Sequence, residues 1–89
     1  MKNSLLLQEF SITYNYRGIR MAGVKAYMSC GFSYFDCILF RDNIISVCFN
    51  GDYWAEIPGC TRTAMSDALG KGIKEFFDKQ PSVVGQVVL

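Results

Sequence analysis

Three short segments between residues 32 and 57 carry apolar side chains on both of their alternating faces. They are rich in Phe, Tyr, Ile, Val and Trp, which favour strands, and they cover residues 32–40, 44–49 and 52–57. The second connection is Asn50-Gly51, a strong hairpin signal because both central residues of a type I′ turn need φ > 0. The pattern predicts a three-stranded antiparallel meander with two apolar faces.

A further pair of strands is predicted before the meander. Residues 8–16 alternate between apolar and polar side chains, which is typical of a half-buried strand. Arg17 and Gly18 mark a turn, and residues 19–28 follow as a second strand. A glycine interrupts this strand, and residues 22–28 also fit a short helix, but we favour the strand.

The turn of this first hairpin decides which residues share a face. With the turn at Arg17 and Gly18, we expect Ile19 and Met21 on the face of Tyr14, and Arg20 on the opposite, polar face. A platform for single-stranded nucleic acid needs aromatic rings beside basic side chains. The predicted separation of Arg20 from Tyr14 therefore argues against such a platform.

A C-terminal helix should begin at Thr61 or Thr63, either of which can cap it, and end at about Lys79. Its apolar residues recur at spacings of three and four and form one stripe: Met65, Ala68, Leu69, Ile73, Phe76 and Phe77. Gly70 and Gly72 each cost roughly 1 kcal/mol of helix stability relative to alanine. That cost is explained if the helix backbone approaches the sheet or a partner closely; simple tolerance of the two glycines is the other interpretation.

The predicted fold class is α+β, as a single domain over residues 1–89. A β-hairpin and then the meander form a mostly antiparallel sheet of about five strands, and the helix packs on one face. Residues 82–89 are rich in valine, and we expect them to add a further strand or to lie against a neighbouring chain.

Two-residue loops in the meander would place an aromatic side opposite the helix. Cys37 and Cys48 would then face each other beneath the helix as small apolar side chains, although a disulfide can be drawn between them. Aromatic residues concentrate at interface hot spots because they bury much area with few torsions to freeze. We therefore predict a partner-binding face made of Tyr34, Ile38, Phe40, Val47, Phe49 and Trp54.

The predicted partner-binding face leads to an expected mutant and leaves one alternative open. On this interpretation, Trp54→Ala should weaken binding more than folding. In the alternative, the first hairpin folds back as a second layer and closes a small sandwich or barrel. The aromatic side would then be internal core, and Trp54→Ala would unfold the protein.

Composition and charge narrow the class of protein. The 89 residues are 51% hydrophobic and 15% aromatic, which argues against disorder. Nine basic and eight acidic residues leave a net charge of +1, which favours neither nucleic acid nor an acidic membrane surface. Residues 1–7 do not resemble a secretory leader, and no apolar stretch is long enough to span a membrane. We expect a cytoplasmic protein.

The sequence offers little for catalysis. Histidine is absent, which removes the commonest general base and metal ligand. The four cysteines are separated by six, ten and eleven residues, without the close pair typical of a zinc site. Their density is low for a disulfide scaffold, so we expect free thiols. We predict no catalytic residue, no metal and no cofactor.

The leading hypothesis is a small non-enzymatic module that binds another protein or itself as a homodimer, acting as an inhibitor. Virus-encoded blockers of host defence such as anti-CRISPR proteins have this scale, an analogy of size and composition alone. The alternative is a small-molecule sensor with a pocket between sheet and helix near Gly70 and Gly72. We expect no membrane partner and rank nucleic acid below both.

Overall fold

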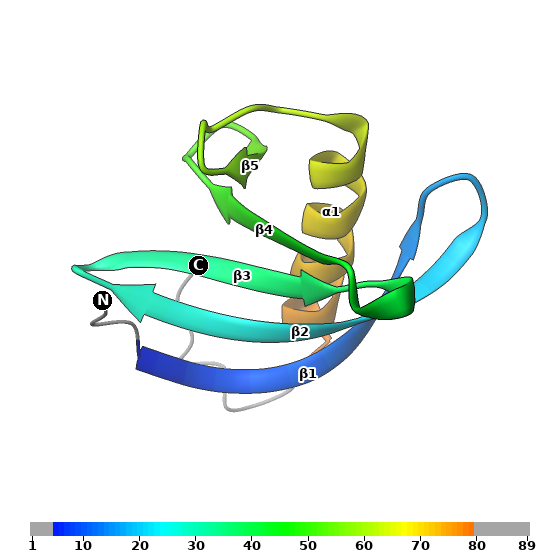
Figure 1. Ribbon diagram of the computed structural model, residues 1–89, viewed down its shortest axis with the longest axis horizontal. Helices are drawn as coiled ribbons and strands as arrows, with labels where there is room; N and C mark the ends of the chain where they lie inside the picture. The colour runs from blue at the N-terminus through cyan, green and yellow to red at the C-terminus, as the bar shows by residue number, and fades with distance from the viewer. Residues whose placement is uncertain (1–4, 80–89) are drawn as a thin grey trace.

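The computed structural model describes residues 5–79 and shows one antiparallel sheet with a helix packed on it (Figure 1). The spatial strand order β1-β2-β3-β4-β5 follows the chain, and every neighbouring pair is antiparallel. The elements are β1 (Leu5–Asn15), β2 (Ile19–Ser29), β3 (Phe32–Ile38), the 3-10 turn η1 (Phe40–Asp42), β4 (Ile44–Phe49), β5 (Trp54–Ile57) and α1 (Ala64–Asp78). The predicted α+β fold is confirmed, while the predicted role of residues 82–89 falls outside the described residues.

The hairpin β1–β2 belongs to the same sheet as the meander. Residues 22–28 are strand, as favoured, and β2 pairs with β3 along Gly23–Ser29 and Phe32–Ile38. The alternative in which this hairpin folds back as a second layer is therefore wrong. No helix or strand of the described residues covers the other side of the sheet, although Cys48 on β4 and Ala55 on β5 are buried there.

Thr63 is the residue that caps α1. Its Oγ1 accepts a hydrogen bond from the Ser66 amide at 2.9 Å, and the Ser66 hydroxyl accepts one from the Thr63 amide at 2.9 Å. The buried Ser66 hydroxyl also donates to the carbonyl of Trp54 at 2.9 Å. The start of the helix is thereby fixed to β5.

The apolar stripe of α1 packs on the sheet as predicted. Leu69 and Ile73 are fully buried, and Met65, Ala68, Phe76 and Phe77 are partly buried against the same cluster. Beneath them, β2 contributes small side chains, Ala22, Val24 and Ala26. These small residues leave room for the helix in the middle of the sheet.

The two helix glycines lie where α1 touches opposite edges of the sheet. A β-carbon at Gly70 would overlap the indole ring of Trp54 on β5, and one at Gly72 would lie 2.6 Å from the carbonyl oxygen of Thr13 on β1. Residues two apart point about 200° apart around a helix. The sheet therefore curls around α1 (Figure 1), and of the two interpretations of the helix glycines the close approach to the sheet is the correct one.

The predicted faces of β1 and β2 are wrong. Arg20 pairs with Tyr14, while Ile19 and Met21 pair with polar residues of β1 and are exposed. The connection holds three residues, of which Arg17 (φ 58°) and Gly18 (φ 113°) have left-handed backbone. The one extra residue reverses which side chains share a face. The argument that separated Arg20 from Tyr14 therefore fails.

The predicted register of the meander is also wrong. Phe35 pairs with Val47, and Ile38 pairs with Ile44, so five residues connect β3 to β4. Arg41 and Asp42 both have left-handed backbone there, with φ of 65° and 58°. This longer turn shifts β4 by three positions, an odd number that exchanges its two faces. Because β5 pairs with β4, the side chains of β5 also lie on the faces opposite to those predicted.

Candidate functional site

The six residues predicted to bind a partner do not share one surface. Tyr34 and Ile38 lie on the side of the sheet away from α1. Val47 is fully buried beneath the helix, and Phe49 and Trp54 are paired on that same side, with their ring centroids 5.5 Å apart. Phe40, in η1, is 79% exposed. The placement of Val47, Phe49 and Trp54 away from the helix is therefore wrong.

The side of the sheet opposite α1 is called the open face here. Register and alternation place on it six apolar or aromatic residues of β2, β3 and β4: Met21, Tyr27, Phe32, Tyr34, Ile38 and Ile44. Met21 is 70% exposed and Ile44 is 59% exposed. Exposed apolar patches often mark interaction sites on small domains.

Three aromatic rings form one end of the open face. The ring centroids of Tyr27 and Tyr34 are 5.3 Å apart at an interplanar angle of 18°, and those of Phe32 and Tyr34 are 6.2 Å apart. The strands hold these rings because Tyr27 is the direct cross-strand partner of Tyr34. The stack is thus built into β2 and β3 rather than into a loop.

A polar row crosses the middle of the open face. Glu9, Lys25, Asp36 and Ser46 are successive cross-strand neighbours on β1 to β4. The Ser46 hydroxyl donates to Asp36 Oδ1 at 2.5 Å. Within residues 5–79, Lys25 makes no ion pair within 4 Å. The ammonium group therefore remains available to a carboxylate of another molecule.

Next to this row, Gly23 leaves a gap in the open face. It pairs with Ser11 on one side and with Ile38 on the other, and a β-carbon built on it would meet no atom within 4 Å. Its φ is not left-handed, so alanine fits the backbone there. The gap lies beside the exposed Met21 on β2, and Ile38 separates it from Ile44 on β4.

The cysteines do not form the predicted cross-strand pair. Cys37 pairs with Ile45 on the helix side, and Cys48 pairs with Ala55 on the other side. All four cysteines are free thiols, with Cys37 and Cys48 buried and the other two exposed. Burial, followed by the Asp36 carboxylate, raises the pKa of Cys37 to about 12, and burial followed by Cys60 raises that of Cys48.

Thiol reactivity should therefore divide into two classes. At pH 8, we expect Cys30 and Cys60 to react with Ellman's reagent within minutes, and Cys37 and Cys48 to react only in denaturant, because the thiolate is the nucleophile. Mass spectrometry of stepwise alkylated protein identifies the modified residues. Four rapid reactions in the native protein would contradict the burial of the sheet cysteines.

The same pKa shift predicts how stability depends on pH. Cys37 ordinarily loses its proton near pH 9.0 but keeps it to about 12 in the folded chain. The unfolded state therefore loses this proton first, and the free energy of unfolding falls as pH rises through that interval. Cys37→Ala should flatten this decline in urea titrations at pH 8 to 10.

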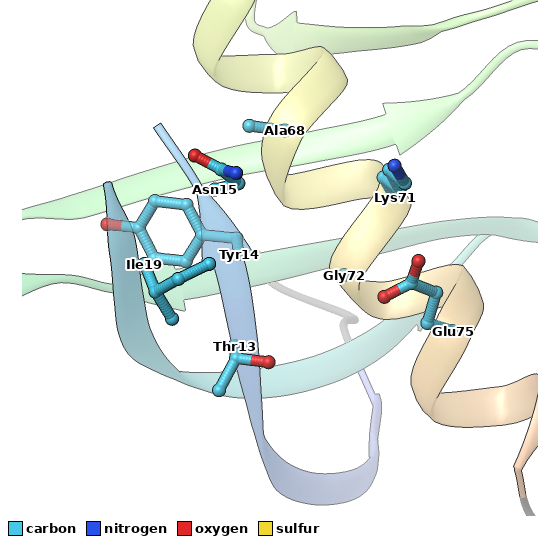
Figure 2. A pocket seen from close by; sticks show the side chains of 8 residues that line it. All are labelled: Thr13, Tyr14, Asn15, Ile19, Ala68, Lys71, Gly72 and Glu75. Carbon is cyan, nitrogen blue, oxygen red and sulfur yellow. The ribbon is translucent and has the colours of Figure 1, made fainter. Parts of the chain in front are cut away.

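A hollow of about 440 Å³ lies between β1 and α1, beside Gly72 (Figure 2). Its lining comes from both elements and from the start of β2: Thr13, Tyr14, Asn15, Ile19, Ala68, Lys71, Gly72 and Glu75. A smaller hollow of about 100 Å³ also borders Thr13 and Gly72. The alternative hypothesis placed a pocket near both glycines, but beside Gly70 the space is filled by Trp54.

Two kinds of site are not found between residues 5 and 79. These residues contain no group of three or more acidic or cysteine side chains arranged to hold a metal ion. Their one helix is too short and too polar to cross a membrane.

No protein-family model matches the chain, and no curated protein or solved structure is significantly similar to it.

Proposed function

We propose that this protein is a non-enzymatic module that binds another polypeptide through the open face, in a cytoplasmic setting. The observation that supports this proposal most directly is the apolar surface on the sheet side that α1 does not cover, including the exposed Met21, Phe32 and Ile44. In a small soluble domain, each such side chain is better buried against a partner than left in water.

The chemistry of the open face also resembles that of an interface. Aromatic rings and methionine are enriched at protein interfaces, and here they flank charged groups that can select the partner. The face rests on a sheet, so its side chains are held in place before binding, which lowers the entropy lost on association. Action as an inhibitor, and the analogy with virus-encoded blockers of host defence, belong to this proposal.

Site-specific photo-crosslinking tests which surface binds. A benzophenone amino acid replaces Tyr34 on the open face in one variant, and Lys74 on the solvent side of α1 in the control. We expect a discrete crosslinked species from position 34 after irradiation in cells, and none from position 74. Equal crosslinking from both positions, or none from position 34, would contradict the proposal.

A second candidate function, small-molecule binding, is supported by the hollow beside Gly72. Its volume lies within the range of ligand pockets, although most of its lining is exposed and half of it is polar. An NMR screen of small polar metabolites tests it, with shifts expected at the amides of Tyr14, Ala68 and Gly72. Unchanged amide shifts across the screen would remove this candidate.

A further inference from the structure

We infer that the open face binds a second copy of this chain, packed face to face about a two-fold axis that runs along the strands between β2 and β3. This inference rests on the proposed function and names its partner. The axis places each residue of β2 over its own cross-strand neighbour from the partner. The surface must then be complementary to itself, and the cross-strand pairs of β2 and β3 test that requirement.

At the polar row, the charges of the open face are complementary to those of a second copy. Lys25 and Asp36 are direct cross-strand neighbours, so the axis places each Lys25 over Asp36 of the other copy. Lys25 has no ion pair within the described residues of its own chain. Two intermolecular ion pairs, related by the axis, would form at the centre of the interface, where exclusion of water strengthens them.

The sizes of the side chains are also complementary, in the row of residues next to the polar row. Gly23 is the cross-strand neighbour of Ile38, so the same axis seats Ile38 of one copy over the gap at Gly23 of the other. On the far side of the polar row, Tyr27 meets Tyr34. A small residue thus faces a large one and an aromatic ring faces another, which is how two sheets interdigitate.

A face-to-face arrangement with its axis across the strands fails on charge. A two-fold axis across the strands, through the polar row, would stack Lys25 on Lys25 and Asp36 on Asp36. Like charges held together at an interface cost several kcal/mol. The charge pattern therefore selects the axis along the strands.

The curvature of the sheet sets the expected strength. The sheet curls around α1 (Figure 1), so its open face is convex. Two copies should therefore touch chiefly along β2 and β3. The paired parts of these strands hold seven residues each, so the strip of contact is roughly 23 Å long. A strip of this length that is two strands wide buries less than the roughly 1,200 Å² of stable complexes, so we expect a weak dimer with a dissociation constant in the high micromolar range.

Exchange of charges tests this inference by sedimentation equilibrium. The native chain should form a dimer, and Lys25→Asp or Asp36→Lys alone should each weaken it at least about tenfold. In an equimolar mixture of the two variants, both intermolecular contacts again join opposite charges. Heterodimers should then form with an affinity within about threefold of the native dimer. Circular dichroism and urea titration verify that each variant is folded.

Gly23→Ala gives a second readout that does not depend on charge. The methyl group meets no atom of residues 5–79 within 4 Å, so the free energy of unfolding should stay equal or rise slightly. The same methyl group occupies the space in which Ile38 of the second copy would pack, and it should weaken the dimer about fivefold or more. Ser33→Ala, on the opposite side of β3, is the matched control and should leave dimerisation unchanged.

The outcomes separate this inference from the proposed function. A chain that stays monomeric at millimolar concentration, or a dimer that neither charge reversal weakens, overturns the self-association. So does a mixture of the two charge variants that fails to associate. If the chain is monomeric while position 34 crosslinks a different protein, the open face still binds, and only the second copy is the wrong partner.

Discussion

Trp54→Ala should lower the free energy of unfolding by about 3 kcal/mol or more. The ring of Trp54 lies under α1, where its centroid is 5.6 Å from that of Phe35 and 5.5 Å from that of Phe49. Its backbone carbonyl accepts a hydrogen bond from the Ser66 hydroxyl, and this bond anchors the start of the helix. Truncation would leave a cavity between helix and sheet, a large loss for a domain of this size. The sequence alone had placed this residue at the partner surface, with folding spared.

Urea unfolding followed by circular dichroism measures the effect. Phe40→Ala is the control because Phe40 is also aromatic but 79% exposed, and its loss should change stability by less than about 0.5 kcal/mol. If Trp54→Ala and Phe40→Ala proved equally mild, α1 would not pack over β5 as described.

Gly70→Ala should destabilise the fold by about 2 kcal/mol, although alanine is the better helix former. The substitution gains roughly 1 kcal/mol of helix propensity. Against this, its β-carbon overlaps the indole of Trp54, whose ring lies against those of Phe35 and Phe49 and must shift to make room. Overpacking of a core generally costs 1 to 3 kcal/mol, and a direct overlap lies at the upper end, so the clash outweighs the propensity.

A double-mutant cycle isolates that clash. In the Trp54→Ala background the overlap is gone, and Gly70→Ala should then stabilise the protein by up to about 1 kcal/mol. The sign of one substitution would thus reverse with the identity of its neighbour. If the two effects simply add, Gly70 is not kept small by Trp54.

These expectations divide the molecule between folding and binding. The helix side of the sheet is occupied by α1 and its core, so changes there act through stability. The open face contributes less to the core, so changes at Lys25, Asp36 and Gly23 should act on association. A binding defect at constant stability is therefore the signature to seek on the open face.

Local patterns in the sequence were enough to predict the elements. Alternation and strand propensity indicated the strands, and apolar spacing indicated α1 with a cap at Thr61 or Thr63, of which the structure shows Thr63. These signals are local because periodicity and capping involve residues within a few positions of one another. The two helix glycines were compatible with a close approach to the sheet or to a partner, and equally with simple tolerance, so the sequence alone did not decide between these interpretations.

Which side chains share a face was decided by the tertiary structure. Left-handed backbone at Arg17 and Gly18, and at Arg41 and Asp42, gives each connection an odd number of residues, three and five, where even loops had been assumed in the meander. A shift by an odd number reverses every side chain of a strand, so a local error moved Trp54 across the sheet. The sequence determined the elements and their apolar content; the turns and the curl around α1 determined which of those residues form the core and which remain on the open face.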